Sequence, residues 1–203
     1  MRKNSYSCFE EKENTLNPFS HLARWIRNIK HAYQRIKYGY CERDVWSIDT
    51  WFLNVFPNMI EELKETAHGF PVNPIDDCSS VSENVDDGME RWQNTLAEMA
   101  FYFREANEDT CKRKNRYQEE YDKALTDFDA KYGIWGEGLK SEDEKKEEKE
   151  SGLFHVYTLR DVPEYKEIWD NYFAEDLSIC QYREECKDKG MEMFRDNFRN
   201  LWD

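Results

Sequence analysis

The chain has 203 residues, 39% hydrophobic and 15% aromatic, and its net charge at pH 7 is −14. So much large apolar surface excludes a disordered chain, and a chain of this length can bury a core of its own. Only eight Gly and five Pro accompany 35% charged residues, a balance that favours helices over an all-β fold with its frequent turns.

Charge is divided unevenly along the sequence. Residues 1–43 hold nine Lys and Arg against four Glu, whereas the other 160 residues hold 20 Lys and Arg against 39 Asp and Glu. A basic N-terminal arm therefore precedes an acidic body, a division that bears on partners and solubility rather than on fold. We expect residues 1–18 to form an N-terminal tail and residues 19–203 to form a single α-helical domain.

The first predicted helix covers residues 19–38. Its apolar residues recur every three or four positions, as one stripe of an amphipathic helix requires, and Ser20 can serve as its N-cap. We expect this stripe to pack in the core; it consists of Leu22, Ile26, Ile29, Tyr33 and Ile36. The other side is a basic helix face with Arg24, Arg27, Lys30 and Arg35. This face can be the solvated side of the helix, a contact for nucleic acid or an anionic membrane surface, or a docking face for the acidic body.

The second predicted helix runs from residue 44 to residue 63, with Asp44 as its N-cap and Pro57 as the site of a kink or a restart. Trp46 is expected to pack in the core or at its rim. A candidate interaction patch combines residues from the start of this helix with the histidine after its end. It consists of Arg43, Asp44, Trp46, Asp49 and His68. Capping and packing are the alternative explanation of these residues.

The rest of the chain also has helical periodicity, and its apolar stripes, which include Leu96, Phe128 and Phe198, are expected to be buried. We predict a loop at residues 70–86 and helices at 87–104, 110–132 and 161–201. Between the last two helices, residues 136–152 hold almost no large apolar side chain, which predicts an acidic exposed linker or a frayed, solvated helix. The fold class is therefore all-α, a bundle of about five helices with a long C-terminal helix.

One acidic pattern suggests metal chemistry. Five carboxylates resemble the pattern of MazG-type nucleotide pyrophosphohydrolases, in which side chains from neighbouring helices hold Mg²⁺ against a triphosphate. They are Glu61, Glu62, Glu65, Glu83 and Asp86.

Phosphate-binding loops and serine-hydrolase motifs are absent from the sequence. The six cysteines lack zinc-site spacing, which favours a reducing compartment, and no apolar run is long enough to span a bilayer.

Four stretches together resemble a family of proteins encoded by tailed bacteriophages. They read YGYCERDVWSIDTWF, AHGFP, ERWQNTLAEMAFYF and MFRDNFRNLWD, and they cover most of the chain apart from the N-terminal arm and the acidic linker. Cys41 and Ile48 depart from the residues expected at their positions. The resemblance implies a viral origin and a host-cell cytoplasm, and it carries no catalytic residue.

The function expected from these observations is that of a non-enzymatic accessory protein that binds a host or phage protein, without a cofactor and without a membrane. An acidic body suits an inhibitor of a host defence complex or another nucleic-acid-handling complex, because the cationic channels of such complexes attract negative charge. Two alternatives stay open: a Mg²⁺-dependent nucleotide pyrophosphohydrolase of the MazG kind, and a nucleic-acid binder that uses the basic helix face.

Overall fold

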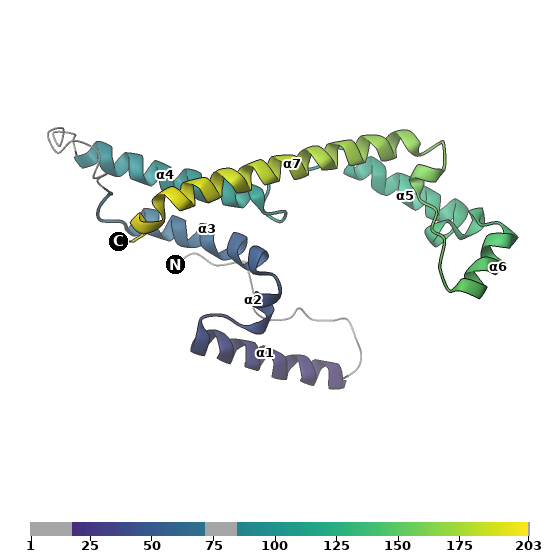
Figure 1. Ribbon diagram of the computed structural model, residues 1–203, viewed down its shortest axis with the longest axis horizontal. Coiled ribbons are helices and arrows are strands. Elements are labelled where there is room, and N and C mark those ends of the chain that lie inside the picture. Colours follow the sequence, from purple (N-terminus) through teal and green to yellow (C-terminus); the bar gives the residue numbers. More distant parts are fainter. Residues whose placement is uncertain (1–17, 72–84, 203) are drawn as a thin grey trace. The chain divides into compact units, whose positions relative to one another are not determined.

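The structure is a computed structural model that describes residues 18–71 and 85–202 (Figure 1). These residues form helices and connecting segments, with no strand among them, so the all-α prediction is confirmed. The α-helices are α1 (Pro18–Tyr38), α2 (Glu42–Trp46), α3 (Ile48–Thr66), α4 (Val85–Ala106), α5 (Gln118–Tyr132), α6 (Glu142–Ser151) and α7 (Lys166–Asn197). Three short 3-10 helices are η2 (Ile134–Leu139), η3 (Leu159–Asp161) and η4 (Phe198–Asn200).

The chain is divided into two compact units. The first consists of Met1–Cys111 and Arg183–Asp203, and the second of Lys112–Tyr182. The long helix α7 belongs to both, because its first part lies in the second unit and its last part in the first. Residues 19–203, predicted to form a single domain, are thus distributed over these two compact units.

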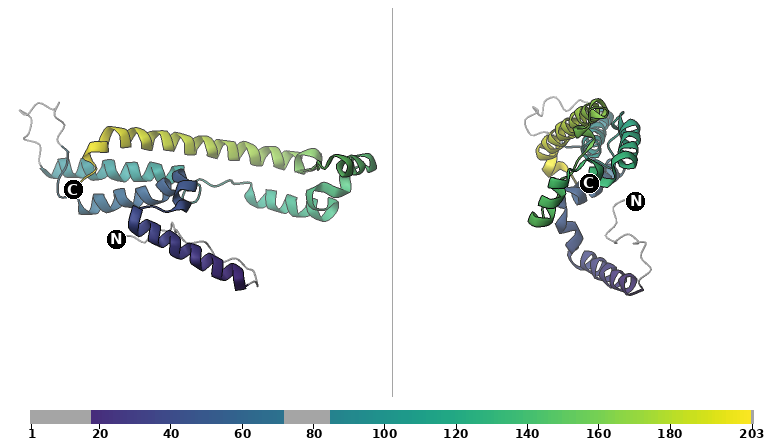
Figure 2. Two further views of the ribbon diagram at one scale, coloured as in Figure 1. Left: turned by 60° about the horizontal axis from the view of Figure 1, so that its bottom comes forward. Right: turned by 90° about the vertical axis from the view of Figure 1, so that its right-hand side faces the viewer.

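An apolar core holds the first unit together, where α3 and α4 lie side by side (Figure 2). Its buried residues recur at helical spacing along α4, where Trp92, Leu96, Met99 and Phe103 face Ile60 of α3. The Phe103 ring is fully buried, and Phe52 and Phe56 approach it edge-on at centroid distances of 5.2 and 5.4 Å. Each such buried side chain contributes about 2 kcal/mol of transfer free energy.

The second unit has a smaller core around α5, η3 and the first part of α7. Phe128, Leu159, Val162 and Tyr165 are buried there. The polar end of Tyr165 is satisfied, because its hydroxyl donates to the carboxylate of Asp127 and accepts from Lys131. This unit therefore has its own apolar centre, as a compact body needs.

Several predicted boundaries differ from the structure. α5 begins at Gln118 rather than near residue 110, and α7 spans Lys166–Asn197 rather than 161–201. Pro57 lies inside one helix, α3, without a restart. The predicted N-cap at Asp44 is wrong: Cys41 is the N-cap of the short helix α2, and Asp44 is its third residue. Of the predicted loop at 70–86, residues 72–84 lie outside the described residues.

Candidate functional site

The polar side of α1 is held against α2 by a buried carboxylate. Arg35 donates from Nε to Oδ2 of Asp44 at 3.0 Å and from Nη2 to Oδ1, while the Asp44 side chain is only 4% exposed. Asp44 Oδ2 also accepts the backbone N–H of Cys41 at 2.8 Å. Burial alone would raise the pKa of Asp44, but the Arg35 and Cys41 hydrogen bonds outweigh it and lower this pKa to about 2.

A second set of contacts joins the same two helices. Lys30 Nζ lies 2.8 Å from both carboxylate oxygens of Glu42, and Gln34 accepts the backbone N–H of Glu42 at 3.1 Å. His31, on the same side of α1, is 7% exposed. Two cations of the predicted basic face, Lys30 and Arg35, thus pair with carboxylates of the chain itself, which does not favour the nucleic-acid alternative.

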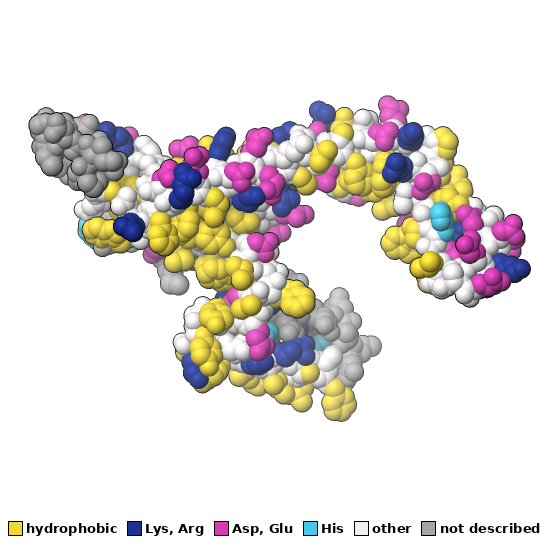
Figure 3. Space-filling view, in the orientation of Figure 1, with side chains coloured by type: hydrophobic (Ala, Val, Ile, Leu, Met, Phe, Trp, Pro, Cys, Tyr) yellow, Lys and Arg dark blue, Asp and Glu magenta, His cyan; other side chains and the backbone are white. Residues whose placement is uncertain are grey.

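The apolar side of α1 faces away from these contacts and is exposed. Its members each expose at least half of their surface, from 50% at Ile29 to 85% at Ile36. We call this surface the α1 apolar face and define it as Leu22, Ile26, Ile29, Tyr33 and Ile36. Figure 3 shows hydrophobic side chains along the lower edge of α1. The prediction that this stripe packs in the core is wrong, because the ion pair of Arg35 with Asp44 fixes the opposite side of the helix inward.

The residues of the predicted interaction patch do not all come together. Arg43 and Trp46 are exposed on α2, with Trp46 91% exposed rather than packed in the core, whereas Asp44 is buried in its ion pair. Asp49 lies in the first turn of α3 and His68 just beyond its other end. A helix of 19 residues is about 28 Å long, so His68 is far from the other four.

His68 instead lines a pocket that could not be predicted from the sequence. This pocket has a volume of about 290 Å³ and is formed by residues 68–71 together with Trp92, Asn200 and Trp202. It brings together residues that are far apart in the sequence, from the segment after α3, from α4 and from the C-terminal segment. The residues were visible in the sequence, but nothing in their spacing showed that they meet.

The carboxylates of the metal-binding alternative are only partly placed. Arg104 donates to both carboxylate oxygens of Glu61 and to Asn58 Oδ1, so it fixes α4 against α3. Glu62 and Glu65 lie on α3, whereas Glu83 and the Asp86 side chain lie outside the described residues. Within the described part of the chain, no group of three or more His, Cys, Asp or Glu side chains could hold a metal ion.

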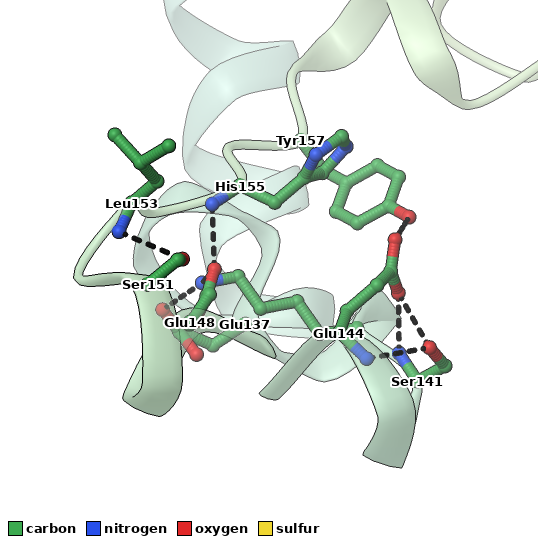
Figure 4. A network of polar contacts seen from close by, with 9 residues as sticks. Glu137, Ser141, Glu144, Glu148, Ser151, Leu153, His155 and Tyr157 are labelled. Atoms are coloured by element: carbon green, nitrogen blue, oxygen red, sulfur yellow. Dashed lines mark hydrogen bonds and ion pairs between the residues drawn. The ribbon is translucent and has the colours of Figure 1, made fainter. Parts of the chain in front are cut away.

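The acidic segment of the second unit is an ordered helix with specific contacts (Figure 4). Ser141 and Glu144 form a capping box at the start of α6, and the Tyr157 hydroxyl donates to Glu144 at 2.7 Å. These hydrogen bonds, with that of Tyr157 the strongest, lower the pKa of Glu144 to about 2. The buried Lys140 ammonium lies 2.7 Å from Glu137 and 2.8 Å from Glu148. Of the two predicted alternatives for residues 136–152, the structure has the helix. Its contacts with Ser141, Tyr157 and Lys140 hold it to the segments on either side.

Beside this network the second unit displays a group of exposed apolar side chains. Ile134, Trp135, Leu153 and Phe154 are between 64% and 77% exposed. Trp135 has a φ of 62°, a left-handed conformation that is uncommon for a bulky residue, and its carbonyl accepts the backbone N–H of Tyr157 at 3.1 Å. The fold thus keeps the Trp135 side chain exposed although the backbone of Trp135 is strained.

Comparison with known proteins gives no match among family models, curated proteins or solved structures. None of the described helices is long and apolar enough to cross a membrane. The cysteines within the described residues, Cys41, Cys111, Cys180 and Cys186, form no disulfide.

Proposed function

We propose that this chain is a non-enzymatic interaction protein, encoded by a tailed bacteriophage, that acts in the host cytoplasm by binding a host or phage protein. The observation that supports the proposal is the orientation of α1. Ordinary surface helices turn their apolar stripe to the core, whereas α1 directs Arg35 and Lys30 to the carboxylates of α2 and leaves its apolar face exposed.

The exposed area is large enough to matter energetically. Fully burying a Leu or Ile side chain contributes about 2 kcal/mol, so covering a half-exposed one contributes about 1 kcal/mol. The five side chains of the α1 apolar face then supply about 5 kcal/mol together. Because association itself costs a similar or larger free energy, from about 4 kcal/mol upwards, the face can anchor a complex but needs complementary contacts around it.

The proposal is tested by affinity purification from infected cells with matched variants. The wild-type chain and the control variant Leu125→Ser/Leu177→Ser, which alters two exposed apolar residues elsewhere, should recover the same partner in comparable amounts. Ile26→Ser/Ile29→Ser should reduce that recovery at least about tenfold, the equivalent of 1.4 kcal/mol. The partner is then purified and the complex reconstituted from the two pure proteins.

Two results would contradict the proposal. One is a recovered set of proteins that is identical for the wild type and the Ile26→Ser/Ile29→Ser variant. The other is Mg²⁺-dependent turnover of nucleoside triphosphates by the pure protein that is lost on Glu62→Ala or Glu65→Ala, which would establish the pyrophosphohydrolase alternative. Circular dichroism of each variant checks that its helices are retained.

A further inference from the structure

We infer that the α1 apolar face is one half of a coiled coil, and that its partner is an amphipathic helix with acidic residues beside its own apolar stripe. The inference rests on the proposed function and names the chemistry of the partner. It follows from the spacing of the exposed residues, from the charge at their edges and from the way α2 occupies the opposite side of α1.

The spacing of the α1 apolar face is that of a coiled-coil seam. Its residues follow one another at intervals of four, three, four and three positions from Leu22 to Ile36, an average of 3.5 that matches alternating a and d positions of a heptad. A helix that packs in a globular core has a wider apolar stripe. On α1 the apolar surface extends beyond the seam only at the edge with Trp25 and Ala32, and the seam residues are exposed along the whole length of the helix.

The charge beside the seam selects the partner. Lys30 and Lys37 each directly follow a seam residue, which places them at e positions, while Trp25 and Ala32 occupy the g positions of the other edge. α1 contains no Asp or Glu. The ion pair of Lys30 with Glu42 is exposed at both ends, so water and an incoming carboxylate compete for this lysine readily. A helix with glutamates at its edges therefore complements α1.

A second copy of α1 complements it less well. In an antiparallel pair, the edge with Lys30 and Lys37 faces the same edge of the other copy, and like charges repel. In a parallel pair, these lysines face Trp25 and Ala32, which supply no carboxylate. Neither arrangement brings a carboxylate of the partner to Lys30 or Lys37.

An anionic membrane surface is also less suitable. A basic amphipathic helix with aromatic residues can lie in a bilayer interface. Here, however, the exposed carboxylate of Glu42 lies beside α1, and the whole chain carries a net charge of −14, so anionic headgroups repel the protein that carries the helix. A partner helix contacts α1 alone, so its carboxylates lie nearest Lys30 and Lys37, whereas a membrane surface extends beneath the rest of the acidic protein.

The test measures binding of the full-length protein to two designed peptides of about four heptads, both with Ile and Leu at their seams. One peptide has Glu at every e and g position and the other has Lys, so each is kept from pairing with itself by like-charge repulsion. Fluorescence anisotropy of labelled peptide gives the affinity. We expect a micromolar dissociation constant for the Glu peptide and binding about tenfold weaker for the Lys peptide.

Variants connect this binding to α1. Ile26→Ser/Ile29→Ser should abolish binding of the Glu peptide, whereas Leu125→Ser/Leu177→Ser should leave it unchanged. Lys37→Glu should reduce the preference for the Glu peptide by about threefold, since it reverses one charge at the edge of the seam.

Equal affinity for the two peptides, or no binding of either, would overturn the inference. It would also fall if the Ile26 and Ile29 side chains instead governed binding to phosphatidylglycerol vesicles, or self-association in sedimentation velocity. If those two residues are still needed to recover a cellular partner, the proposed function survives and only the acidic-helix partner is refuted. If they matter in neither experiment, both proposals fail.

Discussion

Replacing Asp44 by Asn is expected to detach α1 from α2. The pKa of Asp44 is about 2, compared with an ordinary value of 3.8, and one pKa unit corresponds to about 1.4 kcal/mol. The folded state therefore favours the Asp44 carboxylate by about 2.5 kcal/mol. Because its pKa is depressed, this stabilisation is complete above about pH 4 and disappears as the pH falls to about 2. Asn removes it at every pH and leaves Arg35 without its buried counter-charge.

Backbone hydrogen exchange at pH 7 measures the effect helix by helix. Most helical stability in proteins comes from tertiary packing rather than from helix propensity, so the amides of α1 should exchange about sixtyfold faster in Asp44→Asn, while those of the α3–α4 core should change little. Glu42→Gln is the matched control, because it removes the exposed ion pair with Lys30 and should change exchange far less. Unchanged α1 exchange in Asp44→Asn, or an equal effect in Glu42→Gln, would refute this account of how α1 is held.

Three further substitutions test the packing. Leu96→Ala, at a side chain with no exposed surface, should lower the free energy of unfolding by about 3 kcal/mol in urea titrations; a loss of less than about 1 kcal/mol would contradict the assigned core. Gly190→Ala places a Cβ 3.1 to 3.3 Å from three atoms of the Phe103 ring, so it should destabilise by about 1 kcal/mol in the same titrations despite the better helix propensity of Ala. A stabilised variant would show that this ring can move. Trp135→Gly should stabilise by about 1 kcal/mol in thermal unfolding, because glycine adopts a φ of 62° without strain, and a lower melting temperature would argue against strain there.

Hydrophobic periodicity predicted the helices and most of the core correctly. Leu96 and Phe128 were expected inside and are buried, because each belongs to an apolar stripe that has a neighbouring helix to pack against. Phe198, expected on a buried stripe of the last helix, is 62% exposed. α7 ends at Asn197 and the chain continues in the 3-10 helix η4, so a pattern read with α-helical spacing places this residue on the wrong side.

The orientation of α1 could not be predicted from the sequence. Periodicity shows that a helix has two unlike sides, but the side that faces the protein depends on tertiary contacts. Here the deciding contact is the ion pair of Arg35 with Asp44. From the sequence alone, Asp44 was equally suitable as an N-cap. Ser47, with φ and ψ of −141° and 73°, separates α2 from α3, so a helical pattern read continuously through it places Trp46 inside rather than in water.

An exposed apolar face has a colloidal consequence. Protein molecules with exposed apolar patches stay apart in solution when their net charge is far from zero. This chain carries a net charge of −14 at pH 7. Near its isoelectric point, about pH 4.8, that repulsion vanishes while Asp44 is still ionised and α1 still presents Ile36 and its neighbours to water. Acidification should therefore precipitate the folded protein at a higher pH than the pH at which it unfolds. At neutral pH the excess of carboxylates keeps the molecules apart until a partner covers the α1 apolar face.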